Sequence, residues 1–121
     1  MNLLLIAIGG ALGSMLRYLL STFVLRVSGS MFPAGTFAVN FVGCFVFGVI
    51  VGAAEQRVAI APETRVFLLV GVLGGFTTFS SYAYESFALI RDAQFAAAGV
   101  NVVGQVIAGL VGVWAGYVIA H

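Results

Sequence analysis

Apolar residues fill four long stretches of the chain, and short stretches between them hold most of the charged residues. We place the apolar stretches at residues 2–25, 35–54, 64–90 and 95–120. About 20 apolar residues in a helix cross a bilayer, so each stretch is long enough for one crossing. The pattern therefore predicts an all-α membrane protein, with four transmembrane helices forming a single transmembrane domain over residues 1–121.

The third apolar stretch contains a polar interruption between Gly71 and Glu85. Two adjacent glycines, Gly74 and Gly75, disfavour a continuous helix. The hydroxyl residues that follow them are Thr77, Thr78, Ser80 and Ser81. Irregular backbone at membrane depth is tolerated only where it is buried in protein or lines a water-filled cavity. We therefore expect the third helix to be broken in mid-membrane and to form an ion site there.

Polar residues inside the other spans are few, and each has more than one interpretation. Arg17 either caps carbonyls or extends its charge to the membrane surface, or it is an anchor that faces a vestibule. Asn40 either joins helices by hydrogen bonds or lines a pore. Glu85 is the one acidic residue that we place within a span. Asn101 and Gln105 are four residues apart, so they share one face of the fourth helix.

Composition narrows the class of protein further. Hydrophobic residues make up 62% of the chain and charged residues 7%, whereas about 25% of a soluble domain is charged. A net charge of +1 offers no basic surface for nucleic acid. One Cys, one His and four acidic residues give little for a catalytic site. We expect neither an enzyme nor a nucleic-acid-binding protein.

Pairs of glycines four residues apart occur in the first, second and fourth predicted spans, among others. Such pairs allow two helices to approach closely in a membrane. The pairs are Gly9 with Gly13, Gly48 with Gly52, and Gly112 with Gly116.

The four arginines near the ends of the predicted spans are divided evenly between the two faces of the membrane. Arg57 and Arg65 lie near one face, and Arg26 and Arg91 lie near the other. The positive-inside rule therefore selects neither orientation. Four helices also form too thin a bundle to enclose a pore alone. We expect an antiparallel, dual-topology homodimer with an isologous interface.

Three motifs, in order along the first three spans, resemble one known family. They are Gly9-Gly10-x-x-Gly13-x-x-x-Arg17-Tyr18, the run GTFAVNFVG at residues 35–43, and G-x-x-GGFTTFSS at residues 71–81. Together they resemble the fluoride channel family (Fluc, also called CrcB). The fourth span is similar only in length and glycine content. The resemblance implies an antiparallel homodimer with two pores, which passively exports cytoplasmic fluoride across the bacterial inner membrane.

The resemblance also implies two kinds of ion site. Backbone carbonyls of Gly74 and Thr77, from both subunits, would hold a structural sodium ion, and a hard cation does take oxygen ligands. The fluoride pathway would include Asn40, Phe79, Ser80, Ser81, Tyr82 and Asn101. Hydroxyl and amide groups can replace the hydration water of an anion, and aromatic rings present a positive edge.

The sequence departs from the family's usual pattern at two positions of this pathway. The family commonly has Phe where this chain has Tyr82, and often Tyr where this chain has Asn101. Both departures keep or add hydrogen-bonding capacity.

Two other functions compete with the channel. A small proton-coupled multidrug exporter has a similar length, span number and dual topology, but it needs an acidic residue in its first span. Here that span holds Arg17 and no acid, which disfavours the exporter. A non-transporting scaffold subunit is the third alternative, and no particular motif supports it.

Overall fold

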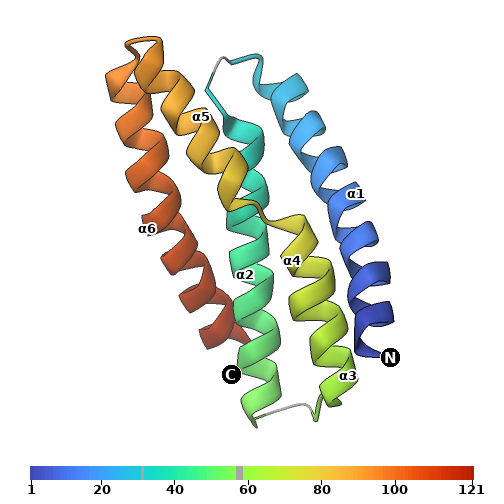
Figure 1. Ribbon diagram of the computed structural model, residues 1–121. Helices are drawn as coiled ribbons and strands as arrows, with labels where there is room; N and C mark the ends of the chain where they lie inside the picture. Colours follow the sequence, from blue (N-terminus) through green and yellow to red (C-terminus); the bar gives the residue numbers. More distant parts are fainter. Residues whose placement is uncertain (31, 57–58) are drawn as a thin grey trace.

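The computed structural model describes residues 1–30, 32–56 and 59–121, which are helical with short connections (Figure 1). Arg57, which enters the charge balance above, lies outside the described residues. Within them, four segments are long and apolar enough to cross a membrane. These segments are Asn2–Ser28, Ala34–Gln56, Pro62–Arg91 and Phe95–Ala120. The prediction of an all-helical protein with four membrane-spanning helices is confirmed.

Three of the four spans are single helices, and the third is assembled from shorter pieces. The single helices are α1 (Asn2–Ser28), α2 (Ala34–Gln56) and α6 (Phe95–Ala120). The third span comprises α3 (Pro62–Arg65), the π-helix η1 (Val66–Val72), α4 (Leu73–Phe76) and α5 (Phe79–Arg91). Both chain termini lie at the same end of the bundle (Figure 1).

Local sequence explains where several of these helices begin and end. Gly29 follows α1 in the left-handed conformation, with φ of 58°, and its N–H donates to the carbonyl of Leu25. Pro62 occupies the first turn of α3, where its missing N–H is not needed. Thr78 caps the N-terminus of α5.

The two halves of the third span pack against different neighbours. The half made of η1 and α4 packs against α1, whereas α5 packs against α6. Helix α2 contacts both α1 and α6 and makes its most extensive contact with α6. In Figure 1 the chain accordingly shifts sideways between α4 and α5. The change of neighbour occurs at the polar segment that the sequence singled out.

Close helix packing depends on the glycine pairs that the sequence predicted. A β-carbon at Gly13 of α1 would clash with the carbonyl oxygen of Val72 in η1. Between α2 and α6 the packing is reciprocal: Gly48 lies against the backbone of Val113, and Gly116 lies against the backbone of Phe45. The expected role of these pairs in close approach is confirmed.

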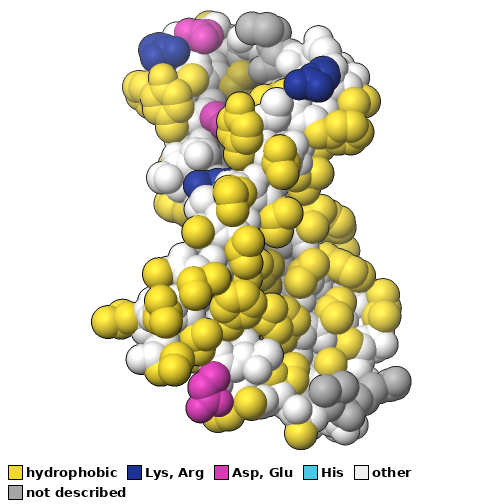
Figure 2. Space-filling model, turned by 90° about the vertical axis from the view of Figure 1, so that its right-hand side faces the viewer, with side chains coloured by type: hydrophobic (Ala, Val, Ile, Leu, Met, Phe, Trp, Pro, Cys, Tyr) yellow, Lys and Arg dark blue, Asp and Glu magenta, His cyan; other side chains and the backbone are white. Residues whose placement is uncertain are grey.

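The chain has a small buried core and a largely apolar surface. Val39, Leu73 and Phe76 form the buried cluster. Large hydrophobic side chains are exposed along every span. Figure 2 shows hydrophobic side chains over most of one face, with charged side chains mainly in its upper half and near its bottom. Such a surface suits a lipid environment or a partner subunit, not water.

Candidate ion site at the break of the third span

Two residues of extended backbone separate α4 from α5. Thr77 has ψ of 158°, and Thr78 has φ of −149° and ψ of 116°. The sequence pointed to Gly74 and Gly75 as the weak place in the helix, but both lie inside α4. The interruption falls later because a side chain on α2 binds the backbone of Thr78, and because threonine favours extended backbone.

Asn40 of α2 satisfies both backbone groups of Thr78. Its Nδ2 donates to the Thr78 carbonyl at 3.0 Å, and the Thr78 N–H donates to its Oδ1 at 2.8 Å. Backbone groups released by a broken helix are costly in an apolar environment unless they are paired. Asn40 therefore supplies the hydrogen bonds that a continuous helix would have provided at this residue.

The side chain of Thr78 begins the next helix. Its Oγ1 accepts from the N–H of Ser81 at 3.2 Å, which is the usual bond of a helix N-cap. The Thr78 hydroxyl donates to Ser81 Oγ at 3.1 Å. Ser81 keeps the hydrogen of its own hydroxyl for another acceptor.

Because of these bonds, two backbone carbonyl groups lack the N–H donors that they would have in a continuous helix. In a continuous helix the N–H of Thr78 would donate to the carbonyl of Gly74, and the N–H of Ser81 to the carbonyl of Thr77. The first N–H goes instead to Asn40 and the second to Thr78 Oγ1. The carbonyls of Gly74 and Thr77 therefore lose their normal helical donors.

A chain of side-chain hydrogen bonds extends from Asn40 to α6 and back to α5. Asn40 Nδ2 donates to Gln105 Oε1 at 2.8 Å, and Gln105 Nε2 donates to Asn101 Oδ1 at 2.9 Å. Asn101 Nδ2 then donates to Ser86 Oγ at 2.9 Å, and Ser86 Oγ donates to the Tyr82 carbonyl at 2.8 Å. We call Gln105, Asn101 and Ser86 the amide chain.

Sequence reasoning found only part of the amide chain. The spacing of Asn101 and Gln105 correctly put them on one face of α6. The contribution of Ser86 was missed, because a serine near the end of an apolar helix commonly bonds its own backbone. Ser86 does this too, while also accepting from Asn101. The hydrogen bond between Gln105 and Asn40 depends on how α2 and α6 pack. Residue spacing within one helix does not specify this packing.

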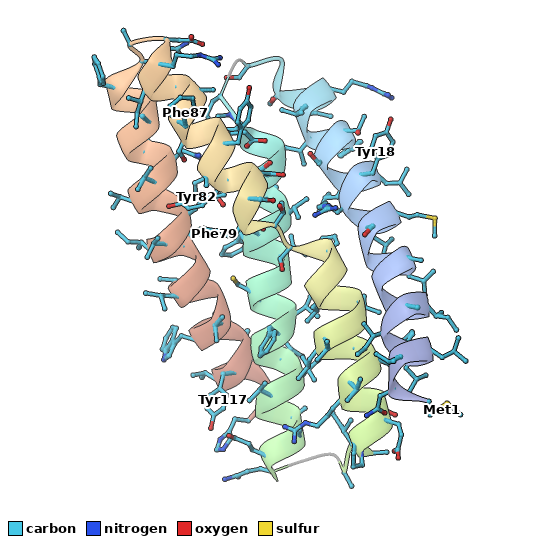
Figure 3. The ribbon with its side chains drawn as sticks, in the orientation of Figure 1. Met1, Tyr18, Phe79, Tyr82, Phe87 and Tyr117 are labelled. Atoms are coloured by element: carbon cyan, nitrogen blue, oxygen red, sulfur yellow. The ribbon has the colours of Figure 1, made fainter. Side chains whose placement is uncertain are left out.

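The predicted aromatic pair lies beside a cavity of about 540 Å³. The rings of Phe79 and Tyr82 are 5.6 Å apart between centroids and tilted by 50° (Figure 3). Both residues line the cavity, together with Asn40, Gly74 and Thr77. The Phe79 side chain is 77% exposed in the single chain.

The Tyr82 hydroxyl is engaged in the fold. It donates to the backbone carbonyl of Val102 on α6 at 2.7 Å. A phenol has one hydrogen to donate, so this bond leaves its oxygen as an acceptor only. The extra hydroxyl at position 82 therefore joins α5 to α6.

A second cavity, of about 280 Å³, lies on the other side of the break and contains the charged residues of the predicted site. Arg17, Thr36, Ser81 and Glu85 line it. Glu85 Oε1 accepts from the Thr36 hydroxyl at 2.8 Å, and the buried Oε2 has no hydrogen-bond partner among the described residues. The cavity thus brings a guanidinium, a carboxylate and hydroxyl groups to one side of the break.

The structure brings most of the predicted site residues to these two cavities. The remaining two predicted site residues line neither cavity. Asn101 is 0% exposed and lines neither cavity. Ser80 is exposed at the start of α5, with its hydroxyl 3.5 Å from that of Thr78. The roles of all these residues in ion movement stay predictions at this point.

The fold and the polar break define a multi-pass membrane protein with candidate ion sites between its helices. The sequence matches the family described as CrcB-like protein, Camphor Resistance (CrcB), over residues 4–117. The chain belongs to this family, and the resemblance carried by the three motifs is confirmed.

Two bacterial relatives have the same name, fluoride-specific ion channel FluC. The relative from Geobacter sulfurreducens is 46% identical over 120 residues, which cover 99% of this chain and 97% of that protein. The relative from Maridesulfovibrio salexigens is 47% identical over 106 residues, covering 88% of this chain and 84% of that protein. The similarity therefore includes all four spans in the first case, not only the three motifs.

Proposed function

We propose that this protein is a fluoride channel, which lets fluoride leave the bacterial cytoplasm passively across the inner membrane. The observation that carries the proposal is the near-full-length similarity to proteins named fluoride-specific ion channel. The polar break agrees with it, because Ser81 keeps a hydroxyl hydrogen and the Phe79 ring stands beside the larger cavity. A fluoride ion that sheds its water needs such donors and ring edges.

We also propose that the channel is an antiparallel, dual-topology homodimer with two pores. Gly74 and Phe79 are exposed at the larger cavity of the single chain, so a second copy would close that cavity. A dual topology is expected because the arginines select neither orientation. A tag on one terminus tests this directly. Labelling from both sides of the membrane is expected, and labelling from one side only would contradict the antiparallel dimer.

A structural sodium ion fits the break of the third span, which in this proposal lies in mid-membrane. The carbonyls of Gly74 and Thr77 lose their helical donors, and carbonyl oxygens are suitable ligands for a hard cation. Sodium would offset the repulsion between the partial negative charges of the carbonyl oxygens that meet where the breaks of two subunits face one another. The proposal assigns it a role in assembly, and assigns the transport path to the side chains around the break.

Growth of a bacterium that lacks its own fluoride exporters tests the function in cells. Expression of this protein should restore growth in millimolar fluoride, and the Phe79→Ile variant should not. The Phe87→Ile variant is a matched control, because Phe87 lies on the same helix and is 56% exposed. No rescue by the well-expressed native protein would contradict the proposed function.

A further inference from the structure

Asn40 has no amide hydrogen left for an ion. An asparagine side chain carries two N–H groups. One donates to the Thr78 carbonyl and the other to Gln105 Oε1, while Oδ1 accepts from the Thr78 N–H. An anion that took a hydrogen from Asn40 would have to break one of these bonds. The geometry therefore separates Asn40 from residues such as Ser81, which keeps a hydrogen to donate.

The direction of the whole series is fixed by backbone groups at its two ends. The Thr78 N–H can only donate and its carbonyl can only accept, which sets the orientation of the Asn40 amide. At the far end the Tyr82 carbonyl can only accept, so Ser86 must donate to it. The side-chain amides of Gln105 and Asn101 therefore have only one orientation in which they bond both Asn40 at one end and Ser86 at the other. Hydrogen bonds aligned in this way strengthen one another.

We propose that Gln105, Asn101 and Ser86 are positioning residues, which orient the side chain of Asn40. In this orientation Asn40 holds the break at Thr78 open. Asn40 then acts on ion movement through the backbone of the break and not as a ligand of the ion. The expected effect on fluoride transport rests on the proposed function, whereas the positioning of Asn40 does not. Asn101 and Ser86 line neither cavity, so any effect that they have on transport passes through their neighbours.

The consequence for the site is local. While Asn40 keeps the Thr78 N–H, this N–H does not return to the carbonyl of Gly74. If the Asn40 amide rotates, the two backbone groups of Thr78 are released, and α4 can add a helical bond across the break. The amide chain thus connects packing between α2, α5 and α6 to the geometry of the candidate ion site.

Amide hydrogen exchange at Thr78, measured by NMR in lipid nanodiscs, tests the proposal independently of transport. The variants are Gln105→Met, which keeps side-chain length without the amide, and Ser86→Ala, which removes one hydroxyl from a residue that lines neither cavity. The control is Val103→Met, because Val103 lies on α6 and is itself 55% exposed. Fluoride efflux from proteoliposomes is measured on the same samples.

We expect Gln105→Met to raise the exchange rate of the Thr78 amide by about tenfold or more, as for a buried bond whose partner is left unsatisfied. Ser86→Ala should raise it by about threefold to fivefold, near the lower range for one lost neutral bond. Fluoride efflux should fall in the same order, and Val103→Met should change neither quantity. The double variant Asn40→Ala with Gln105→Met should exchange no faster than Asn40→Ala alone.

Two results would overturn the inference. In one, Gln105→Met lowers efflux but leaves Thr78 exchange unchanged, so that Gln105 acts on the ion directly. In the other, neither Gln105→Met nor Ser86→Ala alters Thr78 exchange. Ser86→Ala keeps the test decisive if Gln105→Met does not fold. If the native protein carries no fluoride, the proposed function fails, and the exchange rates still decide whether the amide chain positions Asn40.

Discussion

Asn40 and Thr78, which lie on different spans, form two hydrogen bonds through one side-chain amide and one peptide unit. The amide replaces helical bonds at the point where α4 gives way to α5. An asparagine matches this task because it offers a donor and an acceptor side by side. The backbone groups at the break are thus paired by one particular side chain.

Asn40→Asp tests this pairing. A carboxylate would put an oxygen where Nδ2 now lies, facing the oxygens of Thr78 and Gln105. We expect a loss of about 3 kcal/mol in the free energy of unfolding and a fall in fluoride efflux of about a hundredfold, since a fixed negative charge also repels an anion. Asn2→Asp, at the exposed N-terminus, is the matched control. Unchanged stability would contradict the pairing.

Phe79→Ile tests the aromatic wall of the larger cavity. We expect fluoride efflux to fall at least tenfold, because isoleucine lacks the positive ring edge of phenylalanine. The fold of the single chain should be intact, since the Phe79 ring is mostly exposed. Circular dichroism checks the fold, and Phe87→Ile controls for losing an exposed aromatic from α5. Normal efflux in Phe79→Ile would remove this ring from the ion path.

Tyr82→Phe tests the departure from the family pattern. The hydroxyl donates to the Val102 carbonyl, which belongs to a helix and already has a helical donor available. We expect efflux within about threefold of the native protein and a stability loss of about 1 kcal/mol. A fall in efflux beyond tenfold, with stability unchanged, would give this hydroxyl a direct role in conduction.

Gly13→Ala and Gly10→Ala separate packing from helix propensity. A β-carbon at Gly13 would meet the Val72 carbonyl, whereas nothing lies within 4 Å of one at Gly10. We expect Gly13→Ala to cost about 2–3 kcal/mol through overpacking and Gly10→Ala to be neutral or mildly stabilising. Unfolding in mixed detergent micelles measures both. Equal stability of the two variants would contradict the close packing of α1 on η1.

Gly74→Ala tests the proposed assembly. A β-carbon here would have only the Leu69 carbonyl within reach, at 3.8 Å, so the single chain should fold normally. At a two-fold interface it would meet its own twin and crowd the carbonyls proposed for sodium. We expect a loss of dimer in cross-linking and a loss of the sodium dependence of that dimer. Gly99→Ala, which adds a methyl group to open space on α6, is the control. A dimer unaffected by Gly74→Ala would place the interface elsewhere.

The four spans could be predicted from sequence because hydrophobic length is a local property. The glycine pairs were predictable for the same reason, since spacing within one helix defines a face. The position of the break was not. The sequence located the break only within residues 71–85 and marked Gly74 and Gly75 as poor helix formers, whereas the partner that stabilises the break, Asn40, lies on another helix.

The candidate site was predictable mainly through the three motifs. They pointed to Asn40, Phe79 and Ser81, which line the two cavities at the break. The amide chain could not be predicted, because Gln105 and Ser86 meet Asn40 and Asn101 only after α2, α5 and α6 pack. The π-helix η1 also had no sequence signal that we recognised.

Fluoride efflux from proteoliposomes, followed with a fluoride electrode and paired with chloride efflux, tests the central claim most directly. The account predicts rapid efflux that is selective for fluoride and proceeds without a proton gradient. A proton-gradient requirement would favour the exporter class instead. Absence of fluoride efflux from well-folded protein would contradict the channel.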